Sequence, residues 1–537
     1  MSQVGIRRER QKERMRVRGC VAAWLGLLLA GPGEAAWHEV TTPHFVIYSE
    51  GSTDRTRRFA VDLENFDEAA QTALDLDDRK GDNPNPLTVF VVDNVNAVKK
   101  LCEGGQAPDR AKAACRYIGG FYQGRVSGSV AFVPRNAGSG PLELDARTVF
   151  FHEYVHHLML AHSHAAYPAW YVEGFAELIS NVELRSNEII IGYPARSRSM
   201  SLYGDDKMPV WELMAANPSA LSPDRRSTFY ARAWLLTHFL TFSEERKSQL
   251  TQYLQAINQG KSSDAAARGA FGDLQQLDRE VQAYLIRNRF AYLPVAVTQP
   301  APETIKLRQL TPGEAAMMPV RLQSQRMVDS RTAPLVAADA RRIAAAWPND
   351  PEVQLILAEA ELDAGDAMAA EAAADRALAA DPAMRGAMIF KAQALMKRAQ
   401  DENRFDDVTW RTARSWLLKA NKLEPDAAWP LMLFYSSFLQ QGEKPTRNAV
   451  SALERSAELT PQDGQVRMML VSQYLRDRQL KAARSWLVPL AFDPHASAGN
   501  PARRLLERLD RDGLAVVEGP GAGLIDEPVL ELPPEDQ

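Results

Sequence analysis

The 537-residue chain has no excess of basic residues, no long apolar run and few cysteines. It lacks a basic excess, because 63 lysines and arginines face 68 acidic residues, so nucleic acid and anionic membrane surfaces are poor candidate partners. Its one uninterrupted apolar run, residues 20–30, is about half as long as a membrane-spanning helix. A protein with several membrane spans is therefore excluded, and a charged fraction of 24% beside 45% hydrophobic residues excludes a fibrous or wholly disordered chain.

The first 36 residues predict a secretory signal peptide. Seven basic and three acidic residues give this segment a charge of +4, so the remainder of the chain carries −9. A basic stretch at residues 7–18 precedes the apolar run and small residues at 33–36 follow it, which is the order found in signal peptides. An uncleaved signal anchor is the alternative. We therefore expect a periplasmic or secreted protein with no membrane span after signal removal.

Cysteine is also scarce, since only Cys102 and Cys115 lie beyond the predicted signal peptide. In an exported protein, two cysteines with twelve residues between them are expected to form a disulfide. Two free thiols are the alternative. A zinc-thiolate site is less favoured, because neither cysteine belongs to a closely spaced pair.

The remaining chain divides into two halves with different patterns. Residues 37–290 combine helical spacing with short β-branched and aromatic runs, which predict strands at His44–Tyr48, Leu87–Val92 and Val130–Val133. Helices are expected over Arg57–Leu74 and from Asp145 to about Ala161. This half is therefore expected to be α/β or α+β. Residues 291–312 contain four prolines and indicate a linker, with a strand expected at Ile305–Leu310.

From about residue 313, four segments share one alanine-rich pattern. Each has a proline with an alanine twelve residues before it; the pairs are Ala370 and Pro382, Ala413 and Pro425, Ala449 and Pro461, and Ala482 and Pro494. A period near 34 residues, a small residue inside the second helix and a terminal proline resemble the tetratricopeptide repeat. The pattern predicts an all-α repeat domain over residues 313–510, with a plain helical bundle as the alternative. The acidic Gly/Pro-rich residues 511–537 indicate a disordered tail.

Residues suited to chemistry gather between His152 and Glu177. His152 and His156 are four positions apart on a predicted helix, so both imidazoles project from one face and can share one Zn²⁺. Glu153 is placed to accept a proton from a metal-activated water. Surface histidines on an ordinary helix are the alternative.

The downstream carboxylates make a complete ligand set possible. A hydrolytic zinc site needs three protein ligands and one open position. Pro168 is suited to begin a second helix, on which Glu173 and Glu177 share one face. This arrangement permits Glu173 as the third ligand and Glu177 as a hydrogen-bond partner of a ligand histidine. Gly174 is expected to let the two helices that carry the ligands pack closely.

The histidine-helix motif, His152-Glu153-Tyr154-Val155-His156, is followed by Trp-x-x-Glu-Gly-x-Ala-Glu at residues 170–177. Together they resemble the gluzincin metallopeptidases, and most of all the exported bacterial peptidase-MA-like proteins, which often carry tetratricopeptide repeats. The resemblance covers residues 37–250. It implies an α+β zincin-like metallopeptidase domain over residues 37–290, followed by an all-α tetratricopeptide-repeat solenoid. It also implies one Zn²⁺ per chain, with His152, His156 and Glu173 as ligands and Glu153 as general base.

The same resemblance implies two further features. The first is an edge strand before the active helix, at Ser129–Val133, that aligns an extended peptide by strand addition. The second is a tyrosine that stabilises the transition state, on a helix well beyond the third ligand. Tyr230, 57 residues past Glu173, is the nearest match, and a core tyrosine on an amphipathic helix is the alternative.

The sequence therefore predicts an exported zinc peptidase acting on a peptide or protein, with repeats that recruit the substrate or a protein partner. Two alternatives stay open: a repeat scaffold whose zinc site is structural or inactive, and a zinc hydrolase that cleaves another amide, as in cell-wall peptides. The presence of Glu153 favours catalysis, because a structural zinc site needs no general base. The remaining nearby histidines, His157, His162 and His164, are interpreted as non-ligands, and His238 as a core residue.

Overall fold

The computed structural model describes residues 36–74, 76, 85–104, 115, 118–136, 146–161, 165–194, 198–204, 206–493 and 500–513. The predicted signal peptide up to residue 35, His162, His164, Pro494 and the predicted tail from residue 514 lie outside this description. The chain divides into residues 1–35 and 36–537, and the described sheets and helices belong to the second unit. Among them no helix combines the length and apolar character needed to cross a membrane.

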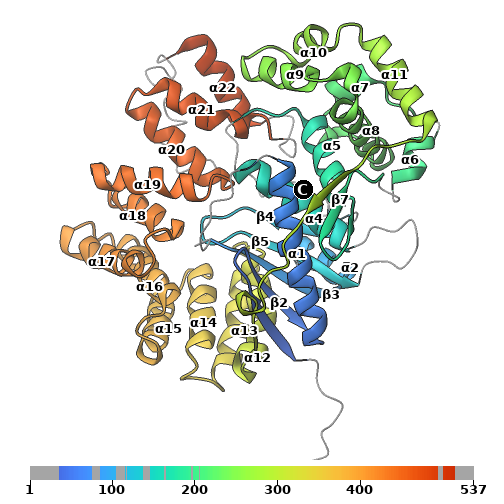
Figure 1. Ribbon diagram of the computed structural model, residues 1–537. Helices are drawn as coiled ribbons and strands as arrows, with labels where there is room; N and C mark the ends of the chain where they lie inside the picture. Colours follow the sequence, from blue (N-terminus) through green and yellow to red (C-terminus); the bar gives the residue numbers. More distant parts are fainter. Residues whose placement is uncertain are drawn as a thin grey trace, which may run out of the picture. The chain divides into compact units, whose positions relative to one another are not determined.

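The N-terminal half contains a mixed sheet of six described strands (Figure 1). Its spatial order is β4-β5-β3-β2-β1-β9. The strands are β1 Trp37–Thr41, β2 Phe45–Glu50, β3 Leu87–Asn94, β4 Phe121–Gln123, β5 Val130–Asn136 and β9 Lys306–Gln309. β2, β3 and β5 are parallel, whereas β1 pairs antiparallel with β2 and β9, and β4 pairs antiparallel with β5. The strands expected at His44–Tyr48, Leu87–Val92 and Val130–Val133 correspond to the parallel strands β2, β3 and β5.

Alternating side chains give this sheet two buried apolar faces. On one face, Phe45 and Val89 share a core with α1 and α4. On the other, Phe90 stacks on Phe132 with ring centroids 5.2 Å apart, in a core that also contains residues of α2. The helices of this half are α1 Thr53–Ala73, α2 Val95–Glu103, α4 Ala146–Ala161, α5 Ala169–Ser180, α6 Ser199–Tyr203, α7 Val210–Ala215, α8 Pro223–Phe242, α9 Gln249–Asn258, α10 Ser263–Phe271 and α11 Leu274–Arg287.

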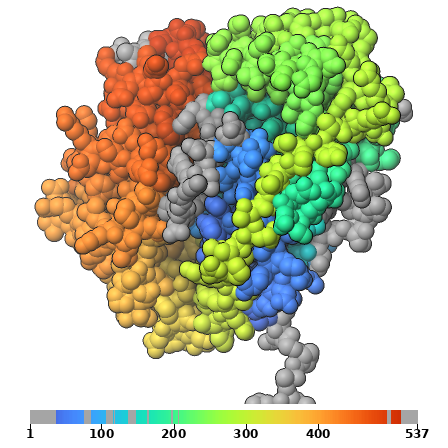
Figure 2. Space-filling model, in the orientation of Figure 1, coloured from blue at the N-terminus to red at the C-terminus, as the bar shows by residue number. Residues whose placement is uncertain are grey.

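The segment predicted to be a linker, residues 291–312, is part of the N-terminal half. Its first strand, β8 Leu293–Ala296, completes a smaller antiparallel sheet with β6 Val182–Leu184 and β7 Glu188–Ile191. Its second, β9, lies within the expected strand and pairs with β1. Both strands lie at sheet edges, where proline is tolerated. In Figure 2 this yellow-green segment runs across the blue N-terminal elements, so the segment packs on the N-terminal half through β8 and β9.

The two cysteines predicted to pair, Cys102 on α2 and Cys115, form a disulfide. Asn94 caps the start of α2 by accepting a hydrogen bond from the Ala97 amide, and Gly104 ends it with a left-handed backbone at φ 63°. Cys102 in the last turn bonds to Cys115 with a Cα–Cα distance of 5.7 Å. The bridge therefore closes the chain between the end of α2 and the residues that lead into β4.

The C-terminal half consists of helices arranged in pairs (Figure 1). Neighbouring helices contact one another and are joined by short turns, which makes each pair antiparallel. The segment that ends at Pro382 contains α14 and α15, with Gly365 at φ 83° in the turn between them. The helices are α12 Pro312–Gln325, α13 Ala333–Ala344, α14 Pro351–Asp363, α15 Ala367–Ala380, α16 Arg385–Asp401, α17 Asp407–Leu423, α18 Ala428–Gln441, α19 Arg447–Leu459, α20 Gly464–Arg476, α21 Leu480–Ala491 and α22 Pro501–Asp512.

The repeat pattern has the packing role expected of it in three of four segments. Ala370, Ala413 and Ala449 are buried in the second helices of their pairs, and each associated proline follows the end of that helix. The fourth segment is displaced by one residue, because Ala483 is buried whereas the predicted Ala482 is half-exposed. The prediction of an all-α repeat domain is confirmed, with this shift of register in α21.

Candidate metal centre

The predicted ligands lie on two helices whose apolar residues fix their orientation. On α4, Phe150, Phe151 and Val155 are buried in the core against the sheet. His152 and Glu153 are half-buried on the same helix, whereas His156 is buried. Helix α5 begins after Pro168 and is buried along most of its length, including Glu173. Both helices therefore hold polar side chains in a largely apolar setting.

Three ligand atoms converge between these helices. His152 Nε2 lies 3.1 Å from His156 Nε2 and 3.2 Å from Glu173 Oε2, and His156 Nε2 lies 3.4 Å from the same oxygen. Each of these atoms offers a lone pair, and Glu173 has no exposed surface. Two imidazole nitrogens and one carboxylate oxygen are the donor set of one class of hydrolytic zinc site. The residues present therefore fit Zn²⁺.

Acidic neighbours determine the charge of His152. Burial by itself would lower the pKa of this imidazole, but the hydrogen bond to Glu173 and the charges of Glu177, Glu173 and Glu153 raise it to about 9. Glu153 follows His152 directly on α4 and is half-buried like it. A site with this electrostatic character favours a positive charge, whether a proton or a metal ion.

Glu177 is held behind His152 by a residue that the sequence did not reveal. Its Oε1 lies 3.9 Å from His152 Nδ1, and Arg198 donates hydrogen bonds to that oxygen from Nε at 3.1 Å and Nη2 at 2.7 Å. Burial would raise the pKa of Glu177, but Arg198 and His152 lower it. Asn181 also donates to Oε2 at 3.3 Å. Arg198 escaped prediction because the β6–β7 hairpin separates it from Glu177, and no spacing rule joins them.

The structure places Tyr230 beside the converging ligands. Its ring centroid lies 6.1 Å from that of His152, and the Arg198 guanidinium carbon lies 4.9 Å from the Tyr230 ring centroid. Burial raises the pKa of Tyr230 well above its usual value, and the charges of Glu173, Glu153 and Glu177 act in the same direction. The hydroxyl therefore keeps its proton at neutral pH and remains a hydrogen-bond donor.

Gly174 serves a different contact from the one predicted. A Cβ at this position would overlap the carbonyl oxygen of Ala233 and Oγ1 of Thr237, both on α8. The close approach is therefore between α5 and α8, not between the two ligand helices α4 and α5. Because α8 carries Tyr230, the absence of a side chain at Gly174 brings that tyrosine close to the ligands on α4 and α5.

A second cluster with the same residue types has a different character. His44 Nδ1 lies 2.8 Å from Glu64 Oε2 and 3.3 Å from Asp67 Oδ2. The other oxygen of Glu64 accepts from the His44 amide, and the other oxygen of Asp67 accepts from the Tyr154 hydroxyl at 2.6 Å. Protein hydrogens therefore satisfy these carboxylates, which is the pattern of a hydrogen-bonded ion cluster. At the first cluster, by contrast, two imidazole nitrogens approach one another and one shared oxygen.

The described histidines predicted to be non-ligands point away from the centre. His157 Nδ1 lies 2.7 Å from the Tyr122 hydroxyl on β4. His238 is buried in α8, where Nε2 lies 3.1 and 3.0 Å from the carbonyl oxygens of Gly192 and Ala291. The Tyr284 hydroxyl lies 3.0 Å from Nδ1 of His238, so the ring is satisfied as a neutral core histidine.

The edge-strand prediction needs correction. Ser129–Val133 falls on β5, which lies between β4 and β3 and is therefore an inner strand. The end of the sheet is β4, whose Tyr122 contacts His157 of α4. The three-residue run of β4 is too short to stand out from the sequence by alternation, which explains the misplacement.

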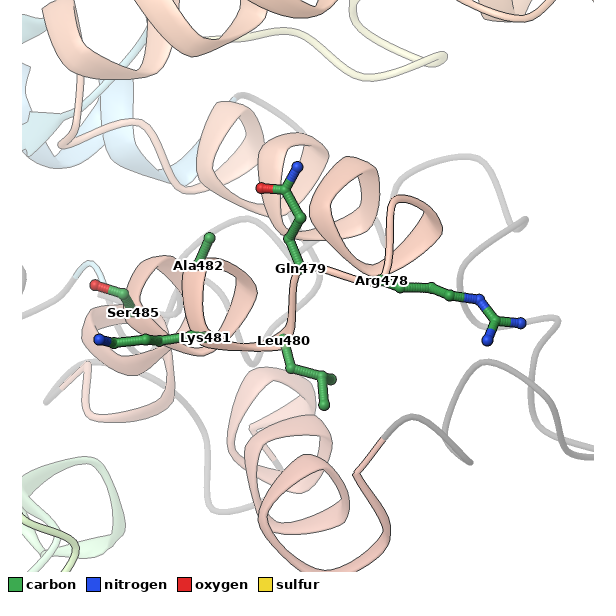
Figure 3. A pocket seen from close by; sticks show the side chains of 6 residues that line it. All are labelled: Arg478, Gln479, Leu480, Lys481, Ala482 and Ser485. Carbon is green, nitrogen blue, oxygen red and sulfur yellow. The ribbon is translucent and has the colours of Figure 1, made fainter.

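An open hollow of about 640 Å³ lies at the turn between α20 and α21 and contains none of the predicted site residues. Figure 3 shows Arg478, Gln479 and Lys481 pointing in three different directions. It is lined by Arg478, Gln479, Leu480, Lys481, Ala482 and Ser485. No converging set of polar groups is formed there, so the chemistry of the described residues is concentrated at the α4–α5 centre.

Comparison with known proteins identifies no family. No family model and no curated protein matches the chain. Among solved structures, the chain is similar to a thermophilic TPR protein of Thermus thermophilus, with 20% sequence identity and a TM-score of 0.30. The alignment covers 36% of this chain and 97% of that one. At this score the similarity carries no argument, and the repeat assignment rests on the helix pairs and their buried alanines.

Proposed function

We propose that this protein is an exported zinc-dependent peptidase that holds one Zn²⁺ through His152, His156 and Glu173. The observation that supports this most is the convergence of two Nε2 atoms and one Oε2 atom, with separations between 3.1 and 3.4 Å. A cation between these atoms could accept a lone pair from all three of them, whereas a single proton is shared by only two atoms. The zincin-like assignment of the N-terminal half belongs to the same proposal, because it rests on the same residues.

The chemistry divides between a metal ion and three side chains around that position. A zinc ion held there would supply Lewis acidity, which lowers the pKa of water and polarises a carbonyl group. Glu153 accepts a proton from the attacking water and delivers it to the leaving amine. Tyr230, whose raised pKa keeps it protonated, donates a hydrogen bond to the carbonyl oxygen as negative charge develops. The negative charge of Glu177, 3.9 Å from His152 Nδ1, favours the tautomer that carries its proton on Nδ1, so that Nε2 presents its lone pair.

The substrate is a peptide or protein aligned along the outer edge of β4. This strand ends the sheet and lies beside the ligand helix through the contact between Tyr122 and His157. A strand with one described neighbour has backbone groups on its other side, and an extended chain can pair with these whatever its own side chains are. Phe121–Gln123, rather than Ser129–Val133, is therefore the strand that would align an extended peptide by strand addition.

The repeat half recruits the substrate or a protein partner, as helical repeats present extended surfaces. Export to the periplasm or beyond is supported by the disulfide between Cys102 and Cys115, which persists in oxidising compartments. A repeat scaffold with an inactive site is the competing function. The half-buried Glu153 beside the ligands favours the peptidase.

Metal content tests the centre directly. We expect about one zinc per chain by elemental mass spectrometry after dialysis of residues 37–537, and none in His156→Ala or Glu173→Ala. The matched control is His44→Gln, which alters the other histidine–carboxylate cluster and should retain zinc. Absence of zinc in the unmodified chain, even after zinc is supplied, would refute the metal site and leave the repeat scaffold.

Cleavage of a peptide library tests the reaction. Glu153→Gln is expected to bind zinc normally and to lose at least about a hundredfold in kcat, which is the usual contribution of a general base. Tyr230→Phe keeps the ring and removes only the hydroxyl, so it is expected to lower kcat with little change in zinc content. Full activity in Glu153→Gln would exclude the proposed reaction while leaving the zinc site intact.

A further inference from the structure

We propose that Arg198 is a positioning residue that holds Glu177 against His152 and thereby strengthens metal binding at the α4–α5 centre. The inference rests on the proposed function, because it concerns the affinity of that same centre for Zn²⁺. Neither the ligand motif nor the acidic motif on α5 includes this arginine. It lies at the N-cap position of α6, outside both helices that carry the ligands.

The geometry gives Arg198 one dominant partner. Nε at 3.1 Å and Nη2 at 2.7 Å both donate to Glu177 Oε1, and this oxygen is the one that faces His152 Nδ1. The two donors come from a planar group, so they fix the direction of the carboxylate as well as its charge. Glu177 is almost fully buried, at 5% side-chain exposure, and Arg198 is 18% exposed. Water therefore has little access to the Arg198–Glu177 contact and cannot readily replace either partner.

The consequence reaches the metal through the imidazole. His152 presents Nε2 to His156 and Glu173, so Nδ1 must carry the proton when Nε2 binds a cation. Glu177 Oε1 lies 3.9 Å from Nδ1, so its negative charge favours the tautomer that carries the proton there. Without Arg198, a buried carboxylate would lose its charged partner and would be free to rotate away. The ring would then lose the group that fixes its tautomer and orientation.

Zinc affinity of the full chain without its predicted signal segment tests the proposal, with a competing fluorescent chelator and zinc alone as the probe. Arg198→Ala and Glu177→Gln are each expected to weaken zinc binding by about 10- to 100-fold. Arg198→Lys should recover only part of the loss, because an ammonium group cannot place two planar donors on one oxygen. Arg225→Ala is the matched control, since Arg225 pairs with Asp206 and Glu212 on the surface, and it should stay within about twofold.

The double variant separates positioning from a general structural effect. If Arg198 acts through Glu177, then Arg198→Ala should cost little further affinity once Glu177→Gln is present. Independent, multiplying losses would overturn the proposal, as would wild-type affinity in Arg198→Ala. If Arg198→Ala does not fold, Arg198→Lys with and without Glu177→Gln provides the same comparison. An unmodified chain that binds no zinc would refute the proposed function itself, whereas zinc binding that is insensitive to Arg198 would refute only this inference.

Discussion

At the scale of single residues, helical periodicity explains why the convergence of His152, His156 and Glu173 was predictable. His152 and His156 share a face because they lie four positions apart on a helix, and Glu173 follows a proline that starts the next helix. Such local rules do not reach contacts made through tertiary packing. Arg198 and the cluster of His44, Glu64 and Asp67 were therefore missed, although both contact residues of the candidate site or of its helix.

His238 provides a prediction about pH at this scale. Burial lowers its pKa to about 4, against about 6.5 in an unfolded chain. Between these values the unfolded chain binds a proton that the folded chain does not, so stability should fall as pH decreases, by about 2 kcal/mol between pH 7 and pH 5. Urea unfolding with a chelator present measures this, because metal release then makes no contribution.

The control is His238→Gln, which cannot take up a proton in either state. The stability difference between the unmodified chain and this variant should narrow as pH decreases from 7 to 5. Parallel pH profiles for the two proteins would show that His238 does not contribute to the pH dependence. Because both ring nitrogens have partners, the variant is expected to be less stable at pH 7 by about 1–3 kcal/mol.

At the scale of secondary-structure elements, strands with strong alternation were predicted and weak ones were not. The three central strands of the sheet are rich in β-branched and aromatic residues, which marks them in the sequence. β4 has three residues, and β8 contains Pro294, so neither carries the usual signal. Both are edge strands, where pairing from one side is sufficient and sequence requirements are relaxed. The misplaced edge strand and the unpredicted strand β8 have this common cause.

Gly174 tests the packing of elements, because it sets the distance between α5 and α8. Gly174→Ala would press a methyl group against backbone atoms of Ala233, which cannot move without displacing α8. We expect a loss of about 1–3 kcal/mol in the free energy of unfolding, as for other overpacked sites. Zinc binding should weaken as well, because Glu173 is the preceding residue.

Gly269→Ala is the matched control for this substitution. Gly269 lies in α10 with open space at its Cβ position, so alanine there should leave stability unchanged or raise it by up to about 1 kcal/mol. Urea unfolding and chelator competition on both variants make the comparison. Equal stability of the two variants would show that the α5–α8 contact tolerates a methyl group and does not fix the site.

At the scale of the whole molecule, the repeats contact the half that carries the candidate site. Val126, between β4 and β5, is buried in a core cluster with Tyr435 and Leu453 of the repeats. Its amide donates to Asp463 Oδ2 at 2.6 Å. Arg467 of α20 donates to the carbonyl oxygen of Leu160, near the end of ligand helix α4. These partners are more than 300 positions apart in sequence, so no local pattern could predict them.

These contacts predict that the repeats stabilise the segment between β4 and β5. Val126→Asp would place an uncompensated charge in the shared apolar cluster and should cost at least about 2 kcal/mol of stability. It should also increase the rate of limited proteolysis between β4 and β5, because that segment loses its cover. Val408→Asp, at a repeat position that is 67% exposed, is the control and should change neither quantity. If Val126→Asp behaves like the control, the packing of Val126 against the repeats does not stabilise the protein or protect the segment between β4 and β5.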